Sequence, residues 1–158
     1  MAITIRAALP EDIEAIANLA EQKRIQYEAY QPVFHRRAEA ALAMHREYLK
    51  SLIHKENVLL WVALEADTVE GFIFASVVAS PVVYNPGGKV CFVDDFVISK
   101  PGLWPTMGKA LLEAVTTELQ KSGVVLGNVV CGPKDTPKRL MLGSMGYSVA
   151  TEWFVKAL

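Results

Sequence analysis

The chain has 158 residues, of which 52% are hydrophobic and 21% charged, and its formal net charge is −1. This length suits one domain with its own core, and the composition excludes an intrinsically disordered chain. The near-zero net charge gives no electrostatic support for binding nucleic acid or an anionic membrane. The longest apolar stretch, residues 71–84, is interrupted by Ser76, Ser80 and Pro81 and is too short to span a bilayer.

The two cysteines, Cys91 and Cys131, lie within apolar runs and form no CxxC or Cys/His pattern. We therefore expect buried thiols in a reducing compartment and no metal site. A role for Cys131 as an acyl-transfer nucleophile stays open, although its apolar context favours packing. No basic region followed by an apolar core occurs near the N-terminus, so we expect a cytoplasmic protein.

In chain order, alternation predicts a strand at residues 3–6, and Pro10 with the acids that follow it opens a helix. Residues 27–37, which contain Pro32, interrupt the helical pattern. A second helix is expected from residue 37 to about residue 54. Its predicted inward residues are Ala41, Met44, Tyr48 and Leu52.

Residues 58–64 and 71–79 predict two antiparallel strands joined by a turn, and a loop follows at residues 81–88. The next run, VCFVDDFVI at residues 90–98, is a predicted strand that carries two adjacent acids. It leads through the loop SKPGLWPT into a helix-patterned run at residues 107–119. Because the first turn of such a helix has unpaired N–H groups and a partial positive charge, this order predicts a site for a phosphorylated ligand.

A buried strand at residues 124–131, a short helix at 137–145 and a final strand or pair of strands at 147–155 complete the pattern. The predicted order is β-α-α-β-β-β-α-β-α-β. This order predicts one α/β domain over residues 1–158, with a mixed, mostly antiparallel sheet flanked by helices.

That order and spacing resemble the GNAT superfamily of N-acetyltransferases. The family's phosphate loop follows the pattern Arg/Gln-x-x-Gly-x-Gly/Ala, and here Leu103, Thr106 and Gly108 stand at the three defining places. A second family pattern, Asn-x-x-Ala-x-x-Leu-Tyr, falls on Asp135, Lys138, Met141 and Leu142. The tyrosine that donates a proton in the family is therefore replaced by Leu142. Pro105 removes one N–H from the loop, yet it also suits the first position of a helix.

The resemblance implies acetyl-CoA or another acyl-CoA as cosubstrate, and acetyl transfer to an amine of a small molecule or a protein. It also implies that the end of the third long strand pairs with the pantetheine arm and that the loop holds the pyrophosphate. The cofactor-binding residues expected on this basis are Phe96, Val97, Ile98, Leu103, Trp104, Thr106, Met107, Gly108, Lys109 and Asp135.

Asp94 and Asp95 are the candidate general bases, since an attacking amine must lose a proton. Neighbours on a strand point to opposite faces, so only one of them is expected to face the cleft. Asp94 is favoured because it shares its face with Phe96 and Ile98, whose apolar surroundings would raise the pKa of the carboxyl group. The alternative is a pair of acids that accept hydrogen bonds from loop or helix N–H groups.

The segments 27–37 and 81–88 are expected to flank the acceptor site in this topology. The aromatic residues that would line it are Tyr27, Tyr30, Phe34 and Tyr84, although each also suits core packing. Residues 153–155 would suit pairing into a homodimer, and equally a core strand.

The sequence leaves two functions open. One is an acyl-CoA-dependent N-acyltransferase, which Gly108, the loop spacing and the acid pair favour. The rival is a GNAT-like domain that has lost catalysis and acts as a CoA-binding or regulatory module, which Leu103, Thr106 and Leu142 favour. A different phosphorylated ligand is a third option.

Overall fold

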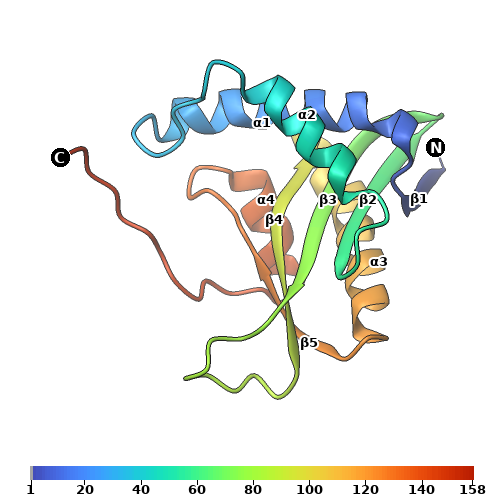
Figure 1. Ribbon diagram of the computed structural model, residues 1–158, viewed down its shortest axis with the longest axis vertical. Helices are drawn as coiled ribbons and strands as arrows, with labels where there is room; N and C mark the ends of the chain where they lie inside the picture. The colour runs from blue at the N-terminus through green and yellow to red at the C-terminus, as the bar shows by residue number, and fades with distance from the viewer. Residues whose placement is uncertain (1) are drawn as a thin grey trace.

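Five strands form one sheet in the order β1-β2-β3-β4-β5, with helices on both faces (Figure 1). The computed structural model describes residues 2–158. The strands are β1 (Ile3–Ala7), β2 (Val58–Glu65), β3 (Thr68–Val78), β4 (Lys89–Ile98) and β5 (Val124–Val129). The helices are α1 (Ile13–Tyr30), α2 (Ala41–Leu52), α3 (Lys109–Gln120) and α4 (Thr136–Ser144). Strands β1 to β4 are antiparallel neighbours and β5 is parallel to β4, which confirms the predicted fold class.

Apolar residues on the two faces of the sheet form two separate cores, because successive strand residues point to opposite faces. One core joins α1 and α2 to the face that carries Val62 and Phe72. The other joins α3 and α4 to the face that carries Ala63 and Ile73. Since both faces are covered, a ligand can reach the sheet only at a strand end or along an edge.

Helix α2 begins at Ala41, later than the predicted residue 37. Of its predicted inward residues, Leu52 is buried and Met44 is 66% exposed, while Tyr48 is 47% exposed with its ring centroid 6.2 Å from that of Phe74 on β3. The inward face of the helix carries the buried Leu49 and Leu52, and His45 lies on the same side, with its Nε2 3.3 Å from the Asp95 carboxylate on β4. The apolar packing of Leu49 and Leu52, together with this polar contact, sets which side of the helix faces the sheet.

The predicted final strand at residues 147–155 does not form. The chain from Tyr147 to Leu158 has no regular secondary structure and runs away from the sheet, shown in red at the left of Figure 1. Every residue from 148 to 158 is exposed. This leaves β5 as one edge of the sheet.

Candidate functional site

Strands β4 and β5 separate halfway along β4. Their parallel pairing runs from Lys89 to Val93, which lies opposite Val129. One further hydrogen bond joins the Val130 N–H to the Val93 carbonyl at 3.1 Å. The remainder of β4, up to Ile98, has no strand partner on its β5 side within residues 2–158. A parallel pair that opens in this way leaves backbone groups at the strand end available to a ligand.

A bulge at Asp94 changes the direction in which the end of β4 faces. The register with β3 skips Asp94, which is therefore an extra residue on β4. Val93, Phe96 and Ile98 consequently pack in the core beneath α3 and α4, while Asp95 turns toward α1 and α2. The prediction that Asp94 shares a face with Phe96 and Ile98 is wrong, because the bulge breaks the alternation between them.

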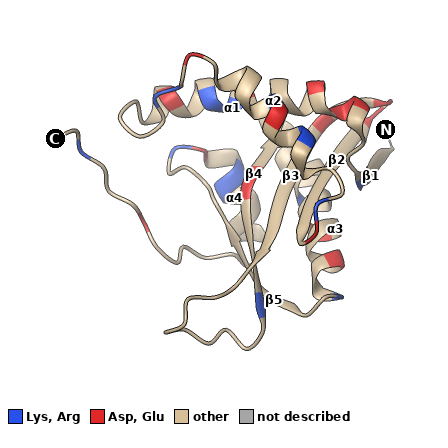
Figure 2. Cartoon of the chain, viewed as in Figure 1, with Lys and Arg blue, Asp and Glu red and all other residues tan. Residues whose placement is uncertain are grey.

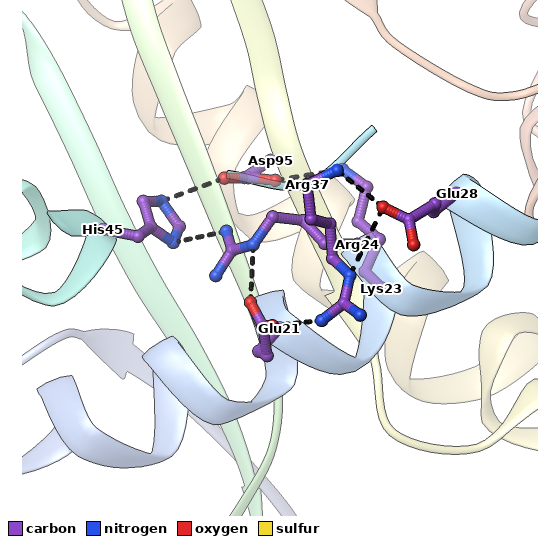
Figure 3. A network of polar contacts seen from close by, with 7 residues as sticks. All are labelled: Glu21, Lys23, Arg24, Glu28, Arg37, His45 and Asp95. Atoms are coloured by element: carbon purple, nitrogen blue, oxygen red, sulfur yellow. Dashed lines mark hydrogen bonds and ion pairs between the residues drawn. The ribbon is translucent and has the colours of Figure 1, made fainter. Parts of the chain in front are cut away.

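Asp95 is held by two basic side chains from the helices above it. Lys23 Nζ on α1 lies 2.9 Å from Oδ1, and His45 Nε2 on α2 lies 3.3 Å from Oδ2 (Figure 3). Burial alone would raise the pKa of Asp95, but the charge of Lys23 and the hydrogen bonds from Lys23 and His45 outweigh it and hold that pKa well below its usual range. Asp95 is therefore a carboxylate fixed in an ion pair.

The ion pair belongs to a wider network that ties α1 to α2 (Figure 3). Arg24 Nη1 lies 2.9 Å from His45 Nδ1, and since a guanidinium can only donate, Nδ1 is the acceptor and Nε2 carries the proton toward Asp95. Glu21 accepts from Arg24 at 2.8 Å and from Arg37 at 2.7 Å. The network fixes the helix pair and the segment after α1 over the end of β4.

Asp94 differs from its neighbour because its carboxylate makes no ion pair or hydrogen bond within residues 2–158. Partial desolvation raises the pKa of Asp94, and repulsion from the Asp95 carboxylate raises it further. Lys23, His45 and Lys138 act in the opposite direction. Of the two predicted bases, Asp94 is the one that is free to accept a proton.

A cleft of about 160 Å³ lies at the end of β4, between α1 and the start of α4. It brings together five of the residues predicted to bind the cofactor. These are Phe96, Val97, Ile98, Trp104 and Asp135. Lys23, Gln22 and Gln26 of α1 line its opposite side.

The loop between β4 and α3 is more ordered than predicted. A 3₁₀ turn at Pro101–Leu103 leads directly into a single π-helical turn at Trp104–Gly108. The N–H groups of Leu103 and Trp104 already bond to the carbonyls of Lys100 and Pro101, and Pro105 has no N–H. Fewer donors are therefore left for a phosphate than the first turn of an isolated helix offers.

Gly108 is required by packing in this loop. A Cβ at this position would lie 2.7 Å from the ring of Trp104, which is buried against Phe96 with ring centroids 4.8 Å apart. Met107 is fully buried as well, whereas Thr106 and Lys109 are exposed. The side chains of Trp104 and Met107 thus belong to the core, and only their backbone is available to a ligand.

Tyr27 has a structural role at the junction of two helices. Helix α1 continues to Tyr30, so residues 27–30, predicted to interrupt a helix, are helical. The buried Tyr27 hydroxyl donates to Asp135 Oδ2 at 2.6 Å and accepts from the Gly132 N–H at 3.1 Å. Burial, together with this bond to Asp135, raises the pKa of Tyr27. The pair joins α1 to the start of α4.

The other predicted acceptor residues do not lie together. Tyr30 is half-buried beside Tyr27, and Phe34 is 52% exposed in the segment after α1. Tyr84 is 71% exposed in the segment between β3 and β4, which lies at the opposite end of the molecule in Figure 1. The expectation that residues 27–37 and 81–88 flank one cleft is therefore wrong.

Lys138 is a further residue of this site, besides Lys23 and His45, that the sequence analysis did not predict. It is fully buried, and its Nζ donates to the Phe96 carbonyl at 3.0 Å and lies 5.2 Å and 5.5 Å from the ring centroids of Phe96 and Trp104. Burial, with help from the charge of Lys23, lowers the pKa of Lys138 to about 7. The sequence signal for its burial was the helical spacing from Lys138 to Met141 and Leu142, since all three residues lie on the buried face of α4.

The acids of β4 and the basic start of α4 thus meet at the centre of the molecule (Figure 2). Among residues 2–158, no group of three side chains of the types that bind metals lies together. In the same part of the chain, no helix combines the length and apolarity that crossing a membrane requires.

The overall architecture is that of GNAT-type acetyltransferases. A mutant of the BH1408 protein from Bacillus halodurans superposes with a TM-score of 0.84 at 16% identity, covering 98% of this chain and 99% of that one. A predicted acetyltransferase with acetyl-CoA from Clostridium acetobutylicum superposes with a TM-score of 0.75 at 14% identity, covering 99% and 96%.

An aminoglycoside acetyltransferase from an uncultured soil metagenomic sample, in complex with sisomicin, superposes with a TM-score of 0.69 at 16% identity, covering 99% and 96% of the two chains. No protein-family model and no curated protein sequence matches the chain. At these identities the likeness establishes the fold.

Proposed function

We propose that this protein is an N-acetyltransferase that uses acetyl-CoA and an amine acceptor. The observation that carries the proposal is the open end of β4, which lacks a partner on its β5 side and lines a cleft between α1 and α4. An extended arm with amide groups adds to such a free strand edge as an extra strand. The fold shared with acetyltransferases, one of them described with acetyl-CoA, supports this use of the cleft.

In the proposed reaction the amine nitrogen attacks the thioester carbonyl carbon, a C–N bond forms and the C–S bond breaks. The amine loses a proton in the process, and Asp94 is the proposed base because its carboxylate is unpaired and its pKa is raised. Leu142 is buried and carries no transferable proton. The departing thiolate would therefore take its proton from water.

Two features of the site predict weak binding of the cosubstrate. The loop before α3 offers few N–H donors for the pyrophosphate, because those of Leu103 and Trp104 are already bonded and Pro105 has none. Lys138 also occupies the carbonyl of Phe96 that an added strand would use. Each lost hydrogen bond of this kind weakens binding by about 0.5–3 kcal/mol.

The second candidate is a GNAT-like domain that binds CoA or a partner without catalysis. The specific observation in its favour is that Lys138 and Leu142 stand where the resemblance has alanine and the proton-donating tyrosine. Both candidates are compatible with a cytoplasmic location, which the two free cysteines support.

Isothermal titration with acetyl-CoA tests the proposal. We expect saturable binding that is lost in Gly108→Ala, because the new Cβ displaces the buried Trp104 ring and with it the Trp104 backbone that lines the cleft. Gly102→Ala is the matched control, since its Cβ would meet no atom within 4 Å. Absence of binding at millimolar acetyl-CoA by folded protein free of copurified CoA would exclude the enzyme and a module that binds CoA, and would leave only a module that binds another partner.

Turnover then separates the two candidates. Release of free CoA thiol is measured over a panel of primary amines, including an aminoglycoside, a diamine and lysine-containing peptides. Amine-dependent thiol release that Asp94→Asn abolishes supports the enzyme. Binding of acetyl-CoA with no release over the whole panel supports the non-catalytic module.

A further inference from the structure

Lys138 on α4 holds a buried amine that the proposed reaction does not use. Its side chain is fully buried, and the Phe96 carbonyl, 3.0 Å from Nζ, is its one hydrogen-bond acceptor among residues 2–158. The rings of Phe96 and Trp104 enclose the same nitrogen, with centroids at 5.2 Å and 5.5 Å. When the amine is neutral, its lone pair has no hydrogen-bond donor in this part of the chain and is free to attack an electrophile.

The surroundings of Lys138 keep a large share of the amine neutral near pH 7. Burial lowers its pKa to about 7, and the charge of Lys23 on α1 acts in the same direction. Asp94 on β4 also interacts with this lysine, whose charge lowers the pKa of the Asp94 carboxyl group. An exposed lysine of ordinary pKa has roughly one neutral amine in a few thousand at pH 7. Three groups oppose the lowered pKa of Lys138 and are outweighed, namely Cys131 after β5, Asp135 at the start of α4 and Asp95 on β4.

The amine lies where the acyl end of the proposed cosubstrate arrives. The arm is expected to run from the loop after Ile98 inward along β4, toward the point at Val93 where β5 separates. Phe96 lies between these two points, and its carbonyl is an acceptor that an added arm uses. Because Lys138 Nζ already occupies this carbonyl, an arm that reaches Phe96 also meets the amine. Pro137, next to Lys138 in the chain, lines the same cleft.

We propose that Lys138 Nζ is an internal acyl acceptor, which takes the acetyl group from acetyl-CoA bound in the cleft of its own chain. The inference rests on the proposed function, because it needs acetyl-CoA in this cleft. The neutral nitrogen attacks the thioester carbonyl carbon, a C–N bond forms and the C–S bond breaks. The nitrogen releases one proton to water, and the departing thiolate takes one proton from water. The products are acetylated Lys138 and the free thiol of CoA.

This modification limits itself to one acetyl group per chain. An amide nitrogen is not nucleophilic, so acetylated Lys138 neither accepts a second group nor passes the first to an amine. The amide keeps one N–H for the Phe96 carbonyl and removes the buried positive charge. Since the acetyl group adds bulk beside this carbonyl, the modified chain should bind acetyl-CoA more weakly than the natural one.

Mass spectrometry of the intact chain after incubation with acetyl-CoA, without any acceptor amine, tests the proposal. At pH 8 most of the Lys138 amine is neutral, and we expect a mass gain of one acetyl group together with one equivalent of CoA thiol. Peptide mapping of the natural chain should place the group on Lys138. Lys138→Met should gain no acetyl group, whereas Lys134→Met, which removes an exposed lysine just before α4, should gain one. Circular dichroism establishes that both variants are folded.

Two further measurements separate a reaction in the cleft from ordinary chemical acetylation. Acetyl phosphate, which lacks the pantetheine arm, should modify exposed lysines and leave Lys138 unchanged over the same time. At saturating acetyl-CoA the rate for Lys138 should rise with pH and level off above about pH 7. The rate for exposed lysines should keep rising toward their ordinary pKa near 10.4. The rate for Lys138 should also be independent of protein concentration, because donor and acceptor belong to one chain.

The outcomes distinguish this inference from the proposed function. Acetyl-CoA that binds in calorimetry but leaves Lys138 unmodified would overturn the inference and leave the cosubstrate in place. Acetylation of Lys138 that is no faster than that of exposed lysines would overturn it as well. Absence of acetyl-CoA binding would refute the inference together with both candidates that bind CoA.

Discussion

The ε-ammonium of Lys138 lies 3.0 Å from the carbonyl oxygen of Phe96, at the point where β4 has already separated from β5. The side chain is fully buried, and no carboxylate within residues 2–158 lies within ion-pair distance of it. A buried cation with one carbonyl partner is destabilising, since its desolvation is only partly compensated. Its position beside the cleft indicates a functional reason for its presence.

Replacement of this lysine by methionine should stabilise the fold near neutral pH. The pKa of Lys138 falls from 10.5 to about 7 on folding, so between these values the unfolded chain binds more protons and stability rises with pH. Below pH 7 the full penalty of the buried charge is present. Lys138→Met should therefore raise the free energy of unfolding by about 1–4 kcal/mol at pH 6.

Denaturant unfolding of both proteins from pH 6 to pH 10 measures this difference. The difference in the free energy of unfolding between Lys138→Met and the natural chain should narrow as the pH rises, because the buried lysine of the natural chain loses its charge. Other groups that titrate in this range contribute equally to both proteins and cancel. A difference that is constant with pH would show that the pKa of Lys138 is not lowered on folding and that the buried lysine keeps its charge.

Removal of the Lys138 side chain should strengthen acetyl-CoA binding. Lys138→Ala frees the Phe96 carbonyl for the added arm and installs the residue that the resemblance has at this position. One additional hydrogen bond corresponds to about a 2- to 10-fold lower Kd by titration calorimetry. Lys134→Ala, which removes an exposed lysine just before α4, is the control and should leave the Kd unchanged.

Asp94→Asn should remove the proposed base while leaving the fold intact. The carboxylate of Asp94 makes no ion pair, so its loss does not disturb the packing of β4. We expect kcat to fall by about 10²–10⁴-fold with little change in KM. If the natural chain catalyses the proposed transfer, its kcat/KM should rise with pH through the raised pKa of Asp94. An unchanged kcat in the variant would remove Asp94 from the mechanism.

Asp95→Asn should lower the stability of the fold, in contrast to Asp94→Asn, which should lower kcat. The carboxylate pairs with Lys23 and His45, and an amide leaves a half-buried cation without its counter-charge. We expect a loss on the order of 3 kcal/mol in the free energy of unfolding at pH 7. Asp67→Asn, in the exposed turn between β2 and β3, is the matched control.

The pH dependence provides a second test of the same pair. Because the pKa of Asp95 lies below 3.8 in the folded state, its contribution is fully present above pH 3.8 and is lost as the pH falls further. The difference between Asp95→Asn and the natural chain should accordingly shrink in acid. If the variant is as stable as Asp67→Asn at pH 7, the ion pair contributes nothing to the fold.

The sequence predicted the elements whose pattern is local. Alternation and apolar runs located β1 to β5, and the loop chemistry around Pro101 and Gly108 located the turn before α3. The bulge at Asp94 escaped prediction because it depends on the register between β3 and β4. It decides which way Asp95 points, and therefore which acid is free.

Long-range polar contacts account for other differences between the predicted and the observed structure. His45 faces the sheet where Asp95 lies beneath it, and the buried Tyr27 hydroxyl donates a hydrogen bond to Asp135, which is distant in the sequence. The predicted final strand at residues 147–155 does not form, because no strand of the described sheet pairs with this segment.

Tyr27→Phe should show how strongly the hydrogen bonds of the Tyr27 hydroxyl, which join α1 to the start of α4, support the cleft. The change removes one hydroxyl that satisfies both Asp135 and the Gly132 N–H, and it leaves a buried carboxylate without its donor. We expect a loss of about 1–3 kcal/mol by denaturant unfolding. Tyr30→Phe is the matched control, because the Tyr30 hydroxyl bonds only to the exposed Gln26 side chain. Since Asp135 lines the cleft, Tyr27→Phe should also weaken acetyl-CoA binding, whereas equal stability and affinity in both variants would show that Asp135 is held in place by other contacts.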